Sequence, residues 1–313
     1  MLPAQLLLAL LFATGLAPVP SMPEKLIDAG HWKRARALVE ARLHEAPEDA
    51  LSHFLLSQIR AAFGDRATPL PLAEKAVALD PSVAKYHRQV AEVLGIMAQH
   101  SNLFQQLLLA RRFRKEIDLT LSLDPRDIQA QRDLMEFYLL APSVAGGDSK
   151  KAAEIAARIA SIDAAEGFLA QARIAEFHRD RAAQEAALRS AVHAAPENYR
   201  ARAALAQLAN DEAQARAAIE IDPGRADAYS VLAGIYASRG AWEELDSILA
   251  AASRAVPDDA APLYRAAERL CGSGRDRERA DRYLRMYLER PPEGNEPSTA
   301  QARAELALCE KSH

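Results

Sequence analysis

Prolines recur along this chain at an interval of 34 residues, and this interval constrains the fold more than any other feature of the sequence. The interval separates two prolines early in the chain and three late in it: Pro47 and Pro81, then Pro223, Pro257 and Pro291. Residues 30–50 and 240–260, aligned on their prolines, share Gly, Trp, Ala and Pro in register, with an acidic pair after the proline. A period of this length is typical of a chain built from stacked structural repeats.

Within one unit, residues 226–259, the apolar positions follow the period of an α-helix. The first apolar stripe consists of Tyr229, Leu232, Ala233 and Tyr236. Gly240 then ends this helix, and a second apolar stripe continues up to Pro257, which ends the second helix. Each unit therefore predicts two antiparallel helices joined by a tight turn. One such hairpin cannot bury its apolar face alone, so neighbouring hairpins must stack.

The composition supports helices and excludes several functional classes. Alanine, the best helix former, supplies 67 of the 313 residues, whereas aromatic residues make up 6%. The 39 basic and 43 acidic side chains give a net charge of −4, which argues against a disordered polyelectrolyte. A protein that neutralises many phosphates needs a basic surplus, so nucleic-acid binding is not expected.

The period and the layout of the unit resemble those of the tetratricopeptide repeat. In residues 226–259 the family pattern is matched by Tyr229, Leu232, Ala233, Tyr236, Gly240 and Pro257. Residues 50–83 match it through Leu56, Ser57, Gly64, Ala76 and Pro81. The resemblance covers roughly residues 23–294. It implies an all-α fold, an α-solenoid of stacked antiparallel helix pairs in a TPR-like superhelix.

The repeat array is expected to span residues 22–294, in about seven to eight units. Two units are enlarged, at 84–127 and 128–166, and one is short, at 199–225. Residues 295–313 are expected to form a capping helix that covers the open end of the stack with a polar face. The insertion at 139–148, within the second enlarged unit, would lie near the concave face, where it could cover the groove.

Residues 1–21 are expected to be a secretory signal peptide. Leu6–Ala13 form an apolar run too short to span a bilayer, and small residues and prolines follow it. The alternative is that this run is the first buried helix of the domain. The first interpretation predicts an exported protein, periplasmic or secreted, and the second a cytoplasmic one. No transmembrane helix is expected in the mature chain.

The resemblance also implies a binding surface, because the first helices of stacked repeats line a concave groove. The unit positions that face such a groove are occupied here by Phe54, Gln58, Arg88, Glu92, Arg132, Glu136, Phe168, Gln171, His178, Arg200, Gln207, Asp227, Ser230, Tyr264 and Glu268. Arg88/Glu92 and Arg132/Glu136 repeat one i,i+4 pair in successive units. The two guanidinium groups are expected either to clamp an anion such as a peptide carboxylate, or to be neutralised by their own glutamates.

Two cysteines lie near the C-terminus, Cys271 in the last repeat and Cys309 in the capping helix. The first helices of adjacent repeats run side by side, and the capping helix occupies the place of the next first helix. A disulfide between the two cysteines is therefore possible in an exported chain. Two free buried thiols are the alternative.

No residue arrangement typical of catalysis or of cofactor binding occurs in the sequence. It has no phosphate-binding glycine loop and no His-Glu-x-x-His motif, and its eight histidines are scattered. The basic run at 110–116 contains one aromatic residue, Phe113, which is too few to stack successive bases and again disfavours nucleic acid. The expectation is therefore no enzyme, no metal and no cofactor.

The sequence thus predicts a non-catalytic scaffold in the cell envelope that binds a protein or peptide in its concave groove. The alternative is a small-molecule or lipid-binding accessory protein that works beside a transporter. In that case the enlarged units at 84–166 would enclose a pocket for the ligand.

Overall fold

The computed structural model describes residues 22–311, with the side chains of residues 22–309. The expected signal peptide at 1–21 lies outside the described residues. Those residues form seventeen α-helices and one short 3₁₀ helix, without a β-strand. The all-α prediction is confirmed. The helices are α1 (Pro23–Asp28), α2 (Trp32–Glu45), α3 (Ala50–Ala62), α4 (Pro69–Leu79), α5 (Ala84–Gln99), α6 (Leu103–Leu123), α7 (Ile128–Leu140), η1 (Ser143–Ala145), α8 (Ser149–Ile162), α9 (Ala164–Phe177), α10 (Arg181–Ala194), α11 (Tyr199–Ala209), α12 (Glu212–Ile221), α13 (Ala226–Arg239), α14 (Trp242–Ala255), α15 (Ala261–Ser273), α16 (Arg277–Leu288) and α17 (Thr299–Lys311).

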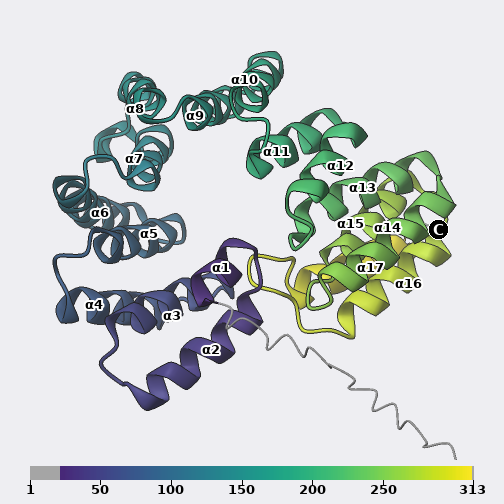
Figure 1. Cartoon of the computed structure of the whole chain (residues 1–313), viewed down its shortest axis with the longest axis horizontal. Helices are drawn as coiled ribbons and strands as arrows, with labels where there is room; N and C mark the ends of the chain where they lie inside the picture. The colour runs from purple at the N-terminus through teal and green to yellow at the C-terminus, as the bar shows by residue number, and fades with distance from the viewer. Residues whose placement is uncertain (1–21, 312–313) are drawn as a thin grey trace, which may run out of the picture.

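The helices form successive antiparallel pairs, and the pairs are arranged in a ring (Figure 1). The first helix of each pair lies toward the inside of the ring and the second toward the outside, as α5 and α6 or α11 and α12 show. The first pair is truncated, because α1 has only six residues. The yellow C-terminal segment returns to the purple N-terminal hairpin, so the two ends of the array meet.

Aspartate and asparagine side chains begin many of the helices. Each accepts a hydrogen bond from a backbone N–H two or three residues later, which satisfies one of the free donors of the first turn. These N-caps are Asp49, Asn102, Asp127, Asp148, Asp163, Asp180, Asn198, Asp211 and Asp276. These caps help to fix where the nine helices start.

A second recurrent contact joins the proline turn to the helix that follows it. The proline carbonyl oxygen accepts a hydrogen bond from the side chain six residues further on. The pairs are Pro47 with His53, Pro81 with His87, Pro125 with Gln131, Pro196 with Arg202, and Pro223 with Tyr229. In five units, the residue six positions after the proline thus donates the same hydrogen bond to the proline carbonyl oxygen. The residue at this position is His, Gln, Arg or Tyr. Two of the apparently scattered histidines, His53 and His87, therefore have a structural role.

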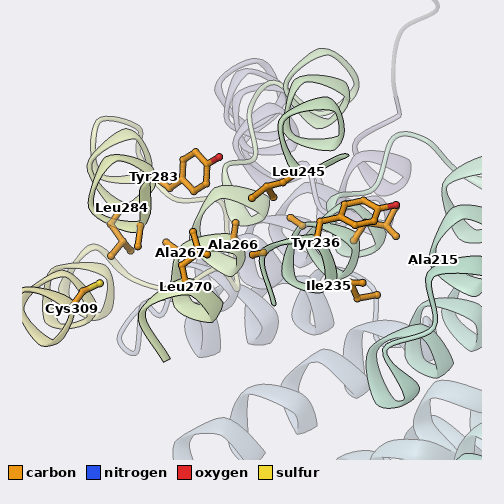
Figure 2. Packing of buried hydrophobic residues seen from close by; sticks show 14 of the residues in the cluster. Ala215, Ile235, Tyr236, Leu245, Ala266, Ala267, Leu270, Tyr283, Leu284 and Cys309 are labelled. Carbon is orange, nitrogen blue, oxygen red and sulfur yellow. The ribbon is translucent and has the colours of Figure 1, made fainter. Parts of the chain in front are cut away.

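The core consists of clusters of buried residues that follow one another along the stacked helices, with alanine and leucine in large part. Near the C-terminus, Leu245, Leu270 and Leu284 are fully buried and face one another across three helices (Figure 2). Ala266 and Ala267 are also fully buried, and their small side chains let neighbouring helices approach closely. This packing explains why a chain with so much alanine forms a stacked array.

One joint departs from the proline turn. A single residue, Asp163, separates α8 from α9, where other units have a proline turn. The short link draws the two helices together at Gly167. A Cβ atom on Gly167 would lie 2.5 Å from the Cα atom of Ala160, closer than non-bonded carbon atoms approach. The absence of a proline at Ala164 and the glycine at 167 are thus parts of one tight joint.

The two enlarged units owe their length to different elements. In the first, both helices are long, with 16 residues in α5 and 21 in α6. In the second, the extra residues form the connection between α7 and α8, which contains η1. Gly147 is required in this connection, because a Cβ atom there would lie 1.8 Å from the carbonyl oxygen of Ala141.

The ring is closed by polar contacts that join His31 and the start of α2 to two C-terminal segments, the turn between α14 and α15 and the segment that precedes α17. The backbone N–H of Lys33 donates to the buried carboxylate of Glu293, and the Lys33 ammonium donates to the carbonyl oxygens of Asp258 and Pro291 at 2.7 and 2.9 Å. Arg34 forms a two-point ion pair with the Asp258 carboxylate. His31 lies 3.3 Å from the same carboxylate. These contacts join residues more than 220 positions apart.

Close packing accompanies the polar contacts. The N–H of Asn295 donates to the carbonyl oxygen of Ala62 at 2.7 Å. A Cβ atom on Gly294 would lie 2.8 Å from Cγ of Trp32 and 2.9 Å from Cβ of Ala62. Only glycine therefore fits at this point of contact. The sequence predicts a solenoid and gives no indication that the two ends of the array meet.

The C-terminal helix α17 covers the end of the stack. It packs against α15 and α16, and Ala302 and Cys309 are buried on its inner side. The structure joins Cys271 to Cys309 in a disulfide, with their Cα atoms 5.2 Å apart. The cap is thereby linked covalently to the last repeat.

Candidate binding site on the inner face of the ring

Charged side chains on the inner helices form ion pairs from one unit to the next. Arg88 on α5 donates from a single guanidinium nitrogen to Glu92, at 3.3 Å, and to Asp133 on α7, at 3.4 Å. Arg173 on α9 holds Glu136 of α7 through two hydrogen bonds, at 2.6 and 2.9 Å. The two arginines and their carboxylate partners therefore form an inter-repeat ladder of alternating charge on the inner surface.

The same ladder continues toward α11. Glu166 on α9 lies 3.9 Å from Arg132 on α7 and 3.3 Å from Arg200 on α11. Arg132 also donates to the side-chain oxygen of Gln129 at 3.2 Å. The expectation that each arginine pairs with its own glutamate holds for Arg88 and Glu92, and is wrong for Arg132. Glu136 turns instead to Arg173, because that side chain of the next unit reaches it with bidentate geometry.

Burial shifts the pKa of two groups in this ladder. It raises the pKa of Asp133 to about 7, although the nearby Arg88 guanidinium acts in the opposite direction. Burial, and then repulsion from Arg200, lowers the pKa of Arg132. Both shifts have burial as their largest cause.

An apolar pocket lies beside the ladder, between the two enlarged units. Its volume is about 310 Å³, and its walls come from α5, α6, α7 and the connection that contains η1. The apolar walls are formed by Leu94, Ile96, Leu109, Phe113, Phe137 and Leu140, and the carboxylates of Glu92, Asp133 and Glu136 line the pocket as well. The rings of Phe113 and Phe137 stack with centroids 5.2 Å apart. A pocket of this size suits a small ligand or one large side chain.

Two solved structures show which known fold this arrangement matches. A thermophilic TPR protein of Thermus thermophilus, TTC0263, superposes with a TM-score of 0.53 over 60% of this chain and 96% of its own, at 17% identity. Yeast Tom70 superposes with a TM-score of 0.55 over 89% of this chain, at 16% identity, and the match spans 58% of the Tom70 chain. The chain has a tetratricopeptide-repeat fold. No protein-family model matches the sequence, and no curated protein does so either.

The tetratricopeptide register places most of the expected groove residues on the inner helices, with one clear correction. Phe54 does not face the groove: it is 4% exposed and packs in the core, where its ring contacts Tyr86 at 5.3 Å. It belongs to a buried cluster that also contains Leu26 and Ile27 of the short helix α1. Gln58 on α3, and Phe168 and Gln171 on α9, remain partly or fully exposed.

Further along the tetratricopeptide array, the expected residues separate into two groups. His178 is the exposed C-cap of α9, and its ring packs against Phe177, away from the ladder. Gln207 and Tyr264, with Asp227 and Ser230, line a smaller pocket of about 140 Å³ together with Glu296. Glu268 is paired with Arg265 of its own helix. The segment before α17 thus covers part of the inner face near α13 and α15.

Sequence reasoning missed three members of the ladder: Asp133, Glu166 and Arg173. A signal for one of them existed, because Arg132, Glu166 and Arg200 stand one repeat apart, at successive intervals of 34 residues, with alternating sign. Asp133 and Arg173 sit in enlarged or irregular units, where the spacing gives no such signal.

The described part of the chain offers neither a cluster of metal ligands nor a membrane-spanning helix. Between residues 22 and 311, no group of three or more His, Cys, Asp or Glu side chains is arranged to hold a metal ion. Over the same range, no helix is both long enough and apolar enough to cross a bilayer.

Proposed function

We propose that the chain is a repeat scaffold that binds a protein or peptide segment on the inner face of its ring, in the cell envelope. The ladder of charges on α5, α7, α9 and α11 carries this proposal. Its side chains are held in fixed positions by their neighbours and yet remain partly exposed, since Arg132 and Glu136 keep about a third of their side-chain surface accessible, 29% and 32%. Pre-positioned charges of alternating sign favour a partner with complementary charges.

The location in the envelope rests on the apolar run Leu6–Ala13, which is typical of a signal peptide. The disulfide between Cys271 and Cys309 supports it, because such bonds persist in oxidising compartments. A binding role of this kind requires no catalytic group.

The test uses charge reversal at Arg88 and Arg132, alone and together. Tagged wild type is isolated from its native cell envelope, and the proteins that accompany it are identified by mass spectrometry. We expect the double variant Arg88→Glu/Arg132→Glu to lose partners that the matched control Arg189→Glu retains, because Arg189 lies on the outer helix α10 and pairs with Glu185. Circular dichroism verifies that all variants are folded. Equal recovery of every partner would overturn the assignment to the inner face.

A second candidate function is binding of a small molecule or lipid, in support of a transporter. The observation that favours it is the apolar pocket of about 310 Å³, because the two enlarged units together form its walls. Native mass spectrometry of protein purified without detergent should then show a bound ligand, and filling the pocket by Gly95→Leu should abolish that signal.

A further inference from the structure

We propose that the pocket between α5, α6 and α7 binds a small amphipathic cation, an ammonium group carried on an alkyl or aryl body. This inference rests on the second candidate function and adds the chemical class of the ligand. It follows from the distribution of charge and apolar surface over the pocket wall.

The charged side chains that line the pocket all have one sign. They are Glu92, Asp133 and Glu136, and the other polar side chains of the lining are the amides of Gln99 and Gln106. No lysine, arginine or histidine is among the lining residues. An anionic ligand would therefore bring its charge against three carboxylates, whereas a cation would be attracted by them.

The carboxylates are only partly neutralised from outside the pocket. Arg88 serves both Glu92 and Asp133 through one nitrogen, at 3.3 and 3.4 Å, which is long for a charged hydrogen bond. Arg173 is fully occupied by its bidentate contact with Glu136 and by Glu176. The charge of Arg132 also acts on Asp133 and Glu136, but this guanidinium is shared with Glu166 at 3.9 Å. Three guanidinium groups thus serve the three lining carboxylates together with Glu166 and Glu176. The Asp133 side chain is 19% exposed, so its charge has little water to stabilise it.

The remaining wall provides the apolar half of the site. Leu94, Leu109 and the stacked rings of Phe113 and Phe137 form it, and aromatic rings also attract cations to their faces. Ile96 and Leu140 lie at the rim, with 36% and 53% of their surfaces exposed, and extend the apolar surface outward. A ligand with a charged head at the carboxylates and an apolar body toward the rim satisfies both halves of the wall.

The test compares three probes that share one chain length: octylammonium, 1-octanol and octanoate. Their binding to the full chain is measured by isothermal titration calorimetry at pH 8, where Asp133 is mostly ionised because its pKa is about 7. We expect octylammonium to bind at least about tenfold more tightly than 1-octanol, and octanoate to bind more weakly than both.

Three variants assign the binding to this pocket. Gly95 lies in helix α5, and a Cβ atom added to it would lie 3.9 Å from the Phe113 ring, so Gly95→Leu fills the pocket and should abolish binding of octylammonium. The matched control Gly272→Leu, in α15, has open space around it and should bind as wild type does. Asp133→Asn removes the central charge and should reduce the preference for octylammonium over 1-octanol to less than about threefold.

The outcomes separate the inference from the function on which it rests. If none of the three probes binds, or if Gly95→Leu leaves binding unchanged, both the pocket function and the inference are overturned. If the three probes bind equally well and Gly95→Leu abolishes their binding, the pocket function stands and the inference about charge is overturned.

Discussion

The backbone N–H of Lys33 donates to both carboxylate oxygens of Glu293, at 3.1 and 3.2 Å, although the two residues stand 260 positions apart in the chain. Lys33 lies in the first turn of helix α2 in the truncated first unit, and Glu293 lies between the last repeat and the capping helix. The contact satisfies a free donor of the first turn of α2 with a carboxylate, which the helix dipole also favours. Glu293, from the C-terminal part of the chain, therefore caps the N-terminus of α2, the first complete helix of the array.

Gly294→Val should open the ring. The new Cβ atom would lie within 3 Å of both Trp32 and Ala62, so α2 and α3 must separate from the C-terminal segment. We expect small-angle X-ray scattering to show a larger radius of gyration, with the helical circular dichroism unchanged. Gly272→Val, at a helical glycine with open space around it, is the control. An unchanged radius of gyration for Gly294→Val would show that the ring does not depend on this contact.

The stability of the closure should also depend on pH. The hydrogen bond and charge of Lys33 favour the ionised form of Glu293, but burial outweighs them and raises its pKa to about 7. The contribution of Glu293 is therefore fully present below the ordinary carboxyl pKa and is lost as pH rises through about 7. For Asp258, burial opposes ionisation, but the hydrogen bonds from Arg34, a backbone hydrogen bond and the charges of His31 and Arg34 together outweigh it and lower the pKa. The contribution of Asp258 is therefore lost at acid pH.

The measurement is hydrogen exchange of the amides in α2, corrected for the intrinsic effect of pH. Opening should become easier between pH 6 and pH 8, by roughly 1–3 kcal/mol. Glu293→Gln should flatten this change, because its side chain cannot ionise. If wild type and Glu293→Gln show the same slope over this range, another group controls the pH dependence.

Loss of the Cys271–Cys309 disulfide should loosen the cap in particular. The bond closes a loop with a sequence separation of 38, for which chain entropy predicts a stabilisation of about 3–4 kcal/mol. In Cys271→Ser/Cys309→Ser, the amides of α17 should exchange much faster than they do in wild type. The amides of α7 should exchange at the wild-type rate and serve as the internal control. Titration of thiols in denatured, unreduced protein provides an independent check, since two free thiols per chain would contradict the bond.

Gly167→Ala should destabilise the array by about 1–3 kcal/mol, because the added methyl group would overlap Ala160 across the one-residue joint between α8 and α9. Gly95→Ala is the matched control: its Cβ atom would lie at an ordinary 3.9 Å from Phe113, and alanine favours the helix by about 0.5–1 kcal/mol. Urea denaturation compares the two variants. Equal stability of Gly167→Ala and wild type would show that α8 and α9 can move apart without cost.

The sequence allows the unit to be predicted much better than the assembly of units. Helix ends depend on local chemistry, such as the Asp211 cap or the left-handed Gly240 at the end of α13, and such features can be recognised from a few neighbouring residues. Ring closure depends on small rotations that accumulate over the whole array, and on residues as distant as Lys33 and Glu293. Neither the rotations nor these long-range contacts can be recognised from a short stretch of sequence.

The binding face shows the same division. The repeat register correctly places Arg88 and Arg132 on inner helices, but their partners are chosen by the distance between units. Glu136 bonds to Arg173 because this side chain on α9 of the next unit reaches it with two hydrogen bonds, at 2.6 and 2.9 Å. For Phe54 the repeat register predicts a side chain exposed in the groove, and this prediction is wrong. The side chain is buried beside the truncated first pair.

The joined ends restrict how a partner can reach the inner surface. An open superhelix admits a long polypeptide from the side, whereas a circular arrangement has no such entrance while Glu293 and Asp258 hold α2 in place. A folded partner, or a polypeptide bound through an internal segment, could reach the inner surface only after these few contacts break. A flexible segment could instead enter the ring by its free end. The contacts of α2 with Glu293 and Asp258 would thereby govern the rate constant of association, separately from the affinity of the complex.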